Sequence, residues 1–254
     1  VTGGVMEAAL RTVYFVLTGK EYDKINFTEV RGLAGVREAT VDINGTAVNV
    51  AIANGMEYLH TDAADVVIVG GVDPLAYLSF GGFSCLGALS PRDCAPYSRS
   101  EGLTLGEGAG FLVLEHFQAA RERGASVLAE LSGYGLSADA HHPTAPDPRG
   151  RGAVAAMMSA LQMAGATVQD IDYINGHGTG TPANDGGEKK ILLHLGDNSI
   201  PMSSTKSMIG HTLGAAGAVE AVTTVMALRE QTLPPTVIPQ DFAEPISFDA
   251  VPNH

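Results

Sequence analysis

The stretch Asp65-Val-Val-Ile-Val-Gly-Gly71 decides the class of fold. This run of β-branched residues has no polar face and ends in two glycines, which predicts a strand buried on both sides of a sheet. Three further stretches have the composition of strands, namely residues 108–115, 127–135 and 172–175. The sequence therefore predicts a sheet whose strands are separated by longer intervening segments.

Helical spacing of apolar residues fills the intervals between these strands. The predicted helices cover about residues 46–60, 116–123, 149–164, 185–195 and 212–229. Alternating strands and helices predict an α/β fold in packed layers. We expect one compact body with a seam near Glu115, which divides residues 1–115 from residues 116–254.

Length and charge narrow the possible functions. The 254 residues can bury a sizeable core, either as one large domain or as two closely packed domains. With 15 basic and 28 acidic residues, the net charge of −13 disfavours nucleic acids and anionic membranes as partners. No run of the sequence reaches the ~18 apolar residues that a membrane span needs, so we expect no membrane insertion.

The cysteines indicate the cellular compartment. Cys85 and Cys94 are too few for a disulfide framework in a chain of this length. We interpret both as small buried thiols and expect a cytoplasmic protein.

Two motifs place a histidine where it could act on a ligand. In Asn175-Gly-His177-Gly-Thr-Gly-Thr-Pro182, the small neighbours of the histidine allow a ligand to approach closely. In Lys206-Ser-Met-Ile-Gly-His211, the histidine precedes the Ala-rich helix predicted at 212–229, and amides at a helix start favour developing negative charge. Taken alone, the ordinary interpretation would be a structural loop histidine and a solvated lysine.

A third segment, Asp139-Ala-His141-His142-Pro-Thr-Ala-Pro146, contains adjacent histidines. Neighbouring histidines rarely converge on one ion without a third ligand placed by the fold, and the chain has no HExxH or CxxC pattern. We therefore predict no metal site.

Taken together and in order, the three motifs resemble those of β-ketoacyl synthases. The closest form is the elongating type of bacterial fatty acid and polyketide synthesis. Leu89-Ser-Pro-Arg-Asp93 and Leu105-Gly-Glu-Gly-Ala-Gly110 also match in order and approximate spacing. Each motif is weak by itself, whereas the ordered set is specific, and the similarity extends from about Gly3 to Pro235.

The resemblance implies roles for individual residues. In such enzymes two histidines contact the carbonyl of the extender thioester, drive its decarboxylation and hold the resulting enolate, which assigns His177 and His211 as the catalytic pair. Lys206 matches a catalytic-site lysine that interacts with an acidic residue, and Glu188 stands at the matching acidic position.

Thr179 and Thr181 match threonines that hydrogen-bond the pantetheine arm of the substrate. The resemblance thus implies a malonyl-type substrate carried on phosphopantetheine or CoA, with no further cofactor. An acyl carrier protein or acyl-CoA would deliver it, and an acidic carrier protein would need a local basic patch on this acidic chain. The candidate cations, unless they are merely scattered surface charges, are Arg149, Arg151, Lys189 and Lys190.

One position departs from the family pattern. Counting back from Gly70 through the helix predicted at 46–60 places Gly45 where these enzymes carry a nucleophilic cysteine, and glycine cannot form an acyl-enzyme. The opening strand–helix region and the C-terminal Gly-Phe-Gly-Gly turn of the family are not found either. We therefore expect a thiolase-like, layered α-β-α-β-α fold that is truncated at both ends.

These features leave several functions open. The favoured one is ketosynthase-like acyltransferase chemistry, in which a malonyl-type thioester is decarboxylated or extended by carbon–carbon bond formation without a Cys acyl-enzyme. The alternatives are a non-catalytic partner resembling a chain-length factor, an acyl-thioester binding module, and a degenerate homologue. The resemblance also implies either a homodimer or a heterodimer with a full-length ketosynthase.

Overall fold

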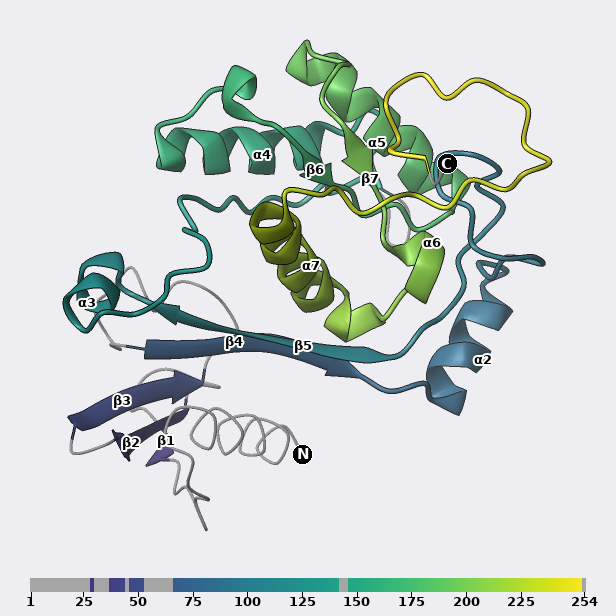
Figure 1. Ribbon diagram of the computed structural model, residues 1–254. Helices are drawn as coiled ribbons and strands as arrows, with labels where there is room; N and C mark the ends of the chain where they lie inside the picture. The colour runs from purple at the N-terminus through teal and green to yellow at the C-terminus, as the bar shows by residue number, and fades with distance from the viewer. Residues whose placement is uncertain (1–27, 30–36, 44–45, 53–65, 142–145, 253–254) are drawn as a thin grey trace. The chain divides into compact units, whose positions relative to one another are not determined.

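The computed structural model describes residues 28–29, 37–43, 46–52, 66–141 and 146–252 (Figure 1). These residues form a mixed α/β structure, as the alternation of strand and helix patterns predicts. The chain separates into two compact units, one of residues 1–71 and 109–128 and one of residues 72–108 and 129–254. The predicted halves, 1–115 and 116–254, cut across both units, because strand β5 (Gly108–Glu115) pairs with β4 (Val66–Asp73) and so joins the first one.

The first unit contains a five-stranded sheet in the order β1-β2-β3-β4-β5. Strand β2 pairs antiparallel with β1 and β3, whereas β3 pairs parallel with β4. Val67 and Ile68 of β4 are 1% and 3% exposed, which confirms the buried strand predicted there. The remaining elements of this unit are β1 (Thr28–Glu29), β2 (Arg37–Ile43), β3 (Thr46–Ile52) and helix α3 (Phe117–Glu122).

The helix predicted at 46–60 is wrong over its described part. Residues Thr46–Ile52 form β3, which pairs along its whole length with β2. Val48, Val50 and Ile52 alternate with smaller residues, and this period of two suits a strand better than a helix. Residues 53–60 lie outside the described part of the chain.

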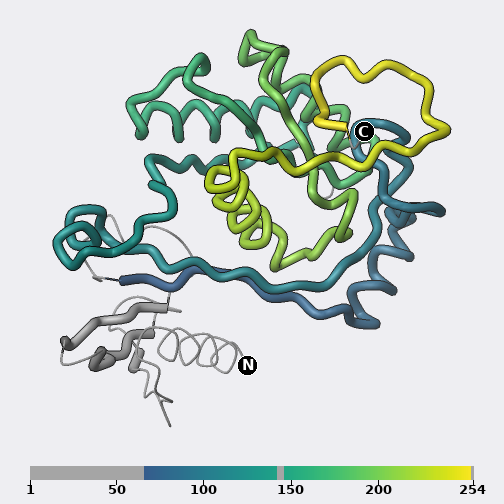
Figure 2. The backbone as a smooth tube through the Cα atoms, in the orientation of Figure 1, coloured from purple at the N-terminus to yellow at the C-terminus, as the bar shows by residue number. Residues whose placement is uncertain are grey.

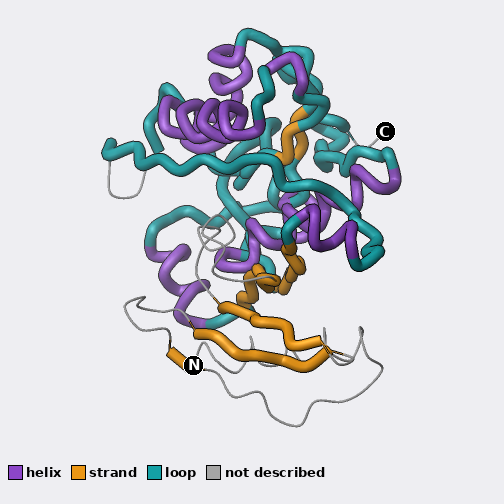
Figure 3. The backbone as a smooth tube through the Cα atoms, turned by 90° about the vertical axis from the view of Figure 1, so that its left-hand side faces the viewer, coloured by secondary structure: helices purple, strands orange, loops and turns teal. Residues whose placement is uncertain are grey.

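The second unit places its longer helices around a short parallel strand pair (Figure 1). Figure 3 shows these strands among helices and loops. The helices predicted at 149–164, 185–195 and 212–229 are confirmed within a few residues, whereas α2 lies where no helix was predicted. The elements are α2 (Tyr77–Cys85), α4 (Arg151–Ala164), η2 (Val168–Asp170), β6 (Ile174–Asn175), α5 (Pro182–Leu195), β7 (Met202–Ser203), α6 (Lys206–Ile209), η3 (Leu213–Ala215) and α7 (Ala216–Glu230).

A small core fixes β6 and β7 against α5. Its central side chains, each at most 3% exposed, are Tyr97, Leu192, Ile200 and Met202. Phe248 meets Tyr97 edge to face, with 5.2 Å between ring centroids. Phe248 belongs to the C-terminal segment, which makes a wide loop after α7 (Figure 2). This core therefore holds the strand end from which the first histidine motif leaves the sheet.

The stretch 127–135 forms no strand ladder within the described residues, so the strand predicted there is wrong as a hydrogen-bonded element. It instead runs along α4, where Gly133 and Gly135 face the carbonyl oxygens of Ala160 and Ala156. A β-carbon at either glycine would lie 2.2 Å and 1.8 Å from these oxygens, respectively. Two extended residues span about 6.6 Å and four helical residues rise about 6 Å. The two glycines are therefore spaced along the segment almost as the two carbonyl groups are along the helix.

The two cysteines differ in environment. Cys94 is 6% exposed, as expected, but Cys85 is exposed on α2, a helix without a buried residue, so its prediction as a buried thiol is wrong. Both thiols are free. No helix within the described ranges is long and apolar enough to cross a membrane.

Candidate active site

His177 and His211 converge as the sequence predicts. Their ring centroids lie 5.2 Å apart and their planes are nearly perpendicular, at 88°. His177 follows β6, and His211 follows the short helix α6. The backbone of His211 is held by Thr104, whose carbonyl oxygen accepts a 2.7 Å hydrogen bond from the His211 amide.

Glycines on the C-terminal side of His177 allow its loop to pack closely. Gly178 and Gly180 have φ angles of 37° and 79°, in the left-handed region that side chains disfavour. A β-carbon at Gly178 would lie 2.3 Å from Cβ of Ser204, and one at Gly180 would lie 2.6 Å from the carbonyl oxygen of Gly102. The motif therefore requires glycine at both positions for steric reasons.

Glu188 anchors the same loop from α5. Its two carboxylate oxygens accept the backbone N–H groups of His177 at 2.6 Å and Gly178 at 2.7 Å. The Tyr97 hydroxyl donates a further bond at 3.2 Å. Burial raises the pKa of Glu188, while the two amides oppose that rise. Glu188 therefore positions the histidine loop.

The acidic partner of Lys206 is Glu220 on α7, so the pairing expected with Glu188 is wrong. Glu188 is occupied by the loop amides, whereas the Lys206 side chain, 2% exposed, reaches toward α7. The Lys206 ammonium also donates to the carbonyl oxygen of His177 at 2.6 Å. Burial raises the pKa of Glu220, and the charge of Lys206 opposes this rise.

Both imidazoles have their Nδ1 atoms engaged. The Lys206 ammonium lies 3.2 Å from Nδ1 of His177, and the backbone N–H of Leu213 donates to Nδ1 of His211 at 3.1 Å. An ammonium and an amide N–H are donors, so each Nδ1 acts as the acceptor. A neutral ring then carries its hydrogen on Nε2.

The surroundings favour these neutral rings. Partial removal from water, then the charge of Lys206 and the neighbouring His211, lower the pKa of His177 from 6.5 to about 4. Burial, followed by Lys206, lowers the pKa of His211 to about 4 as well. At neutral pH, therefore, both rings present an N–H donor without a positive charge.

Thr179 and Thr181 lie side by side, with their hydroxyl oxygens 2.9 Å apart. The Thr181 hydroxyl caps α5 by accepting the Asn184 amide at 3.4 Å, and Pro182 occupies the first helical position. These contacts give both threonines a local structural role. Their binding of a pantetheine arm stays a prediction.

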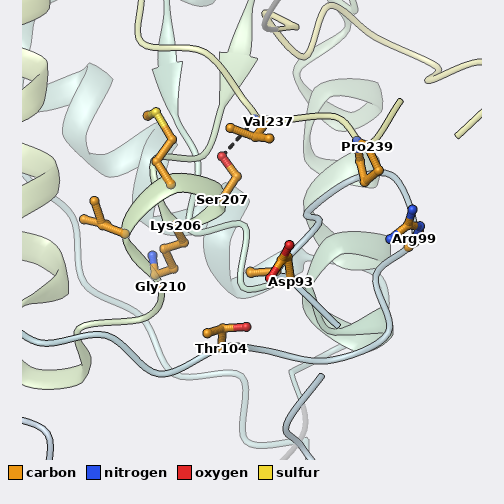
Figure 4. Close-up of a pocket in the computed structure, with 11 residues that line it drawn as sticks. Asp93, Arg99, Thr104, Lys206, Ser207, Gly210, Val237 and Pro239 are labelled. Carbon is orange, nitrogen blue, oxygen red and sulfur yellow. Dashed lines mark hydrogen bonds between the residues drawn. The ribbon is translucent and has the colours of Figure 1, made fainter. Parts of the chain in front are cut away.

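A cavity of about 520 Å³ lies beside α6, within the size range of ligand pockets (Figure 4). Lys206, Thr104 and Cys94 are among its lining residues. The Cys94 thiol donates to the carbonyl oxygen of Thr179 at 3.4 Å, and burial raises its pKa. A thiol with a raised pKa stays protonated near neutral pH, which is the opposite of an activated nucleophile.

Gly45 lies outside the described residues. Its assignment to the nucleophile position depended on a helix beginning at residue 46, and that segment is strand β3. The count therefore no longer supports the assignment. In the described ranges, no three His, Cys, Asp or Glu side chains gather where they could hold a metal ion.

Sequence reasoning missed two residues that complete the site. Glu220 is an acidic residue within the otherwise small and apolar start of α7, and this contrast could have marked it as a buried ion-pair partner. Tyr97 is fully buried and contacts Glu188, but nothing in its local sequence points to this contact.

Comparison with known proteins identifies relatives of this site. Residues 128–238 match the family model "Beta-ketoacyl synthase, C-terminal domain". The 3-oxoacyl-(acyl-carrier-protein) synthase 2 of Vibrio cholerae serotype O1 is 39% identical over 240 residues, which cover 90% of this chain and 58% of that protein.

Two solved structures share the fold. The ishigamide ketosynthase/chain length factor aligns with a TM-score of 0.72 and 37% identity, covering 78% of this chain and 49% of that one. A type II PKS acyl-carrier protein in complex with its ketosynthase bound to the hexaketide aligns with a TM-score of 0.73 and 35% identity, covering 78% and 52%. The chain thus spans about half the length of its relatives.

The beginning of the chain has a different match. Residues 1–66 match the model "Iron only hydrogenase large subunit, C-terminal domain". The Vibrio cholerae synthase aligns over 90% of the chain, so its similarity also extends into this segment, in agreement with the resemblance expected from about Gly3 onward.

The remaining motifs agree with one another. The converging histidines, the buried Lys206 and the glycine-rich loop all lie within the matched residues 128–238, and the structural relatives are ketosynthases with a thiolase-like α/β fold. On this evidence the chain belongs to the β-ketoacyl synthase family of the thiolase superfamily.

Proposed function

We propose that this protein decarboxylates a malonyl-type thioester and that His177 and His211 stabilise the resulting enolate. The proposal rests on the contacts of both Nδ1 atoms, which leave the hydrogen of each neutral ring on Nε2. Two uncharged Nε2–H donors therefore lie on rings whose centroids are 5.2 Å apart. Preorganised donors around a developing oxyanion are the largest single source of stabilisation in many enzymes.

The reaction balances without a covalent acyl-enzyme. The bond between the α-carbon and the carboxylate breaks, CO₂ leaves, and the electron pair moves into an enolate on the thioester oxygen. A proton from water at the α-carbon then gives an acetyl thioester and leaves hydroxide. Attack of that carbon on the carbonyl of an acyl thioester instead forms a carbon–carbon bond, breaks the C–S bond of that thioester and releases its thiolate. Lys206 holds the His177 ring and carbonyl in place for either outcome.

The substrate would arrive on phosphopantetheine or CoA and needs no further cofactor. The cavity beside Lys206 offers room for part of it. One solved relative is described in complex with an acyl-carrier protein, which supports such a protein as the donor here. Free Cys85 and Cys94 suit the reducing cytoplasm, where we place the reaction.

The test is CO₂ release from malonyl-CoA by the full chain. His177→Ala or His211→Ala should each lower the rate about 100-fold or more, because each removes one donor to the enolate. His194→Ala is the matched control, since His194 lies on the exposed face of α5. Release that is unchanged in both site variants would overturn the proposal.

A second candidate is a chain-length-factor-like partner of an active ketosynthase. It is favoured by the alignment with the ishigamide ketosynthase/chain length factor. In that case the isolated chain releases no CO₂, and it co-purifies with a ketosynthase whose product length it alters.

A further inference from the structure

We infer that Tyr97 is a positioning residue for the proposed reaction: its backbone amide and its hydroxyl hold the two carboxylates of α5, which in turn fix the loop of His177. The inference rests on the proposed function, because it concerns the placement of one of the two enolate donors. Tyr97 acts through α5 and not on the substrate. Its contacts, its enclosure by the loop and its backbone conformation support this role.

Tyr97 binds the two carboxylates through different groups. Its backbone N–H donates to Asp185 at 2.9 Å, and its hydroxyl donates to Glu188 at 3.2 Å. Asp185, which is 1% exposed, also accepts the Gly180 amide at 3.2 Å. Glu188 accepts two further amides of the same loop. Each carboxylate therefore links Tyr97 to the loop that follows β6.

The Tyr97 hydroxyl keeps its proton. Burial, followed by the charges of Glu188 and Asp185, raises the pKa of Tyr97 well above its usual range. An ionised carboxylate can only accept hydrogen bonds, so the bond to Glu188 is directed from the tyrosine to the acid at neutral pH.

The Tyr97 hydroxyl oxygen lies against the backbone on both sides of His177. A β-carbon at Gly176 would lie 2.1 Å from this oxygen, and one at Gly178 would lie 2.8 Å from it. The Tyr97 side chain is fully buried. The hydroxyl thus fills the space that the two glycines leave, and its removal would open a gap directly beside the histidine loop.

The contacts of Tyr97 maintain an unfavourable backbone conformation. Its φ angle is 62°, in the left-handed region that bulky side chains rarely adopt. The ring is held edge to face by Phe248, and the backbone N–H is held by Asp185. Such conformations persist only where the surrounding structure fixes them, and they are concentrated at functional sites. The strain is therefore further support for a positioning role.

Glu188 transmits the position of Tyr97 to the histidine. Its Oε1 accepts the His177 amide, and its Oε2 accepts the Gly178 amide. Two donors from outside the loop, the Tyr97 hydroxyl and the Asn184 side chain, hold Oε2 in place. Without the hydroxyl the carboxylate is freer to rotate, and the loop amides move with it. A displacement of about 1 Å can lower a rate about 100-fold, so a smaller shift still has a measurable effect.

The experiment compares Tyr97→Phe with the control Tyr173→Phe. Tyr97→Phe removes the hydroxyl and leaves the ring in place. Tyr173 is a half-buried tyrosine whose hydroxyl forms a 2.8 Å hydrogen bond with the hydroxyl of Ser203, so the control loses a comparable bond. The values of kcat and KM for CO₂ release from malonyl-CoA are measured for the parent and both variants, and urea unfolding confirms that each chain is folded.

We expect Tyr97→Phe to lower kcat about tenfold and to change KM by less than about twofold, because it displaces an enolate donor without removing a contact to the substrate. Tyr173→Phe should keep both constants within about twofold of the parent. A Tyr97→Phe variant that loses stability but has the kcat of Tyr173→Phe would overturn the inference, since Tyr97 would then serve folding alone.

Glu188→Gln tests the route of the effect. If Tyr97 acts through Glu188, adding Tyr97→Phe to Glu188→Gln should lower kcat by less than about twofold further. A further loss of about tenfold would show that the two residues act independently and would contradict the inference.

An NMR measurement separates the inference from the proposed reaction. The backbone amide signals of His177 and Gly178 should shift in Tyr97→Phe and stay at the parent positions in Tyr173→Phe, because only the first variant alters their acceptor. If the parent releases CO₂, the kinetic comparison decides. If no chain releases CO₂, a shift confined to Tyr97→Phe supports the positioning role while the proposed reaction fails, and unchanged signals overturn both.

Discussion

At the scale of single residues, the two imidazoles have the same protonation state through different contacts. A lysine ammonium occupies Nδ1 of His177, and a backbone amide occupies Nδ1 of His211. Both contacts disfavour a proton on Nδ1, because it would face another donor. The pair is therefore held neutral by local geometry as well as by limited access to water.

The pH dependence follows from these contacts. Both histidines have pKa values lowered from 6.5 to about 4, so CO₂ release should stay level from neutral pH down to about pH 5 and fall with a midpoint near 4. A plot of kcat for malonyl-CoA against pH measures this midpoint. A midpoint near 6.5 would show that ordinary histidines carry the activity.

The same shifts affect folding. The unfolded chain binds protons at these rings near pH 6.5 and the folded chain only near pH 4, so their contribution to stability is complete above pH 6.5 and is lost as pH falls toward 4. Urea unfolding at pH 7 and pH 5 should show this loss, and it should be smaller in His211→Gln than in the control His194→Gln.

Only some residues of the site could be predicted from the sequence. His177, Lys206 and His211 were recognisable because their motifs contain local signals, namely glycines, small residues and spacing. The partner of Lys206 was not, because Glu188 and Glu220 are both acidic and the choice depends on which helix faces the ammonium. Such a choice is made by tertiary packing.

At the scale of elements, close backbone contacts decide where helices and extended segments meet. Gly133 and Gly135 bring an extended segment against the carbonyls of α4. This arrangement has no side chain at either position to separate the two backbones. The glycines therefore act as spacers of minimal size.

Gly135→Ala should destabilise the second unit by about 1–3 kcal/mol, because the added methyl group overlaps the carbonyl oxygen of Ala156. Gly186→Ala is the matched control, since it lies in α5 with no atom within 4 Å of the added carbon, and should stabilise by up to about 1 kcal/mol. Urea unfolding curves compare the two. Equal effects would contradict the contact.

Prediction of the elements succeeded where one local pattern dominated. The apolar runs of β4 and β5 and the helical spacing of α4, α5 and α7 were sufficient. Prediction failed at β3, where a helical spacing of apolar residues over 46–60 was preferred to the alternation of Val48, Val50 and Ile52. It also missed α2, because its apolar residues and paired glycines have no polar face to define a helical period.

At the scale of the whole molecule, the chain contains two compact units, each with buried apolar residues. Ile68 of β4 is 3% exposed in the first, and Leu192 of α5 is 1% exposed in the second. The first unit also contains the residues that match a hydrogenase family, whereas the ketosynthase family model matches residues that lie almost entirely in the second.

We expect denaturant unfolding to show two transitions. Leu192→Ala should lower the free energy of unfolding of one transition by about 2–5 kcal/mol, and Ile68→Ala should lower that of the other by a similar amount. Circular dichroism and fluorescence of site-specific labels, one in each unit, can follow the two separately. If both variants shift a single common transition, the units unfold as one cooperative body.

The engagement of both Nδ1 atoms has a consequence for substrate choice. With hydrogens on both Nε2 atoms and donors at both Nδ1 atoms, neither ring offers a free lone pair to take a proton from carbon. A thioester that must lose a C–H proton to become a nucleophile, such as acetyl-CoA, finds no proton acceptor on either imidazole. A malonyl group generates its carbanion by losing CO₂ instead, so under the proposed function the two imidazoles favour a malonyl over an acetyl thioester.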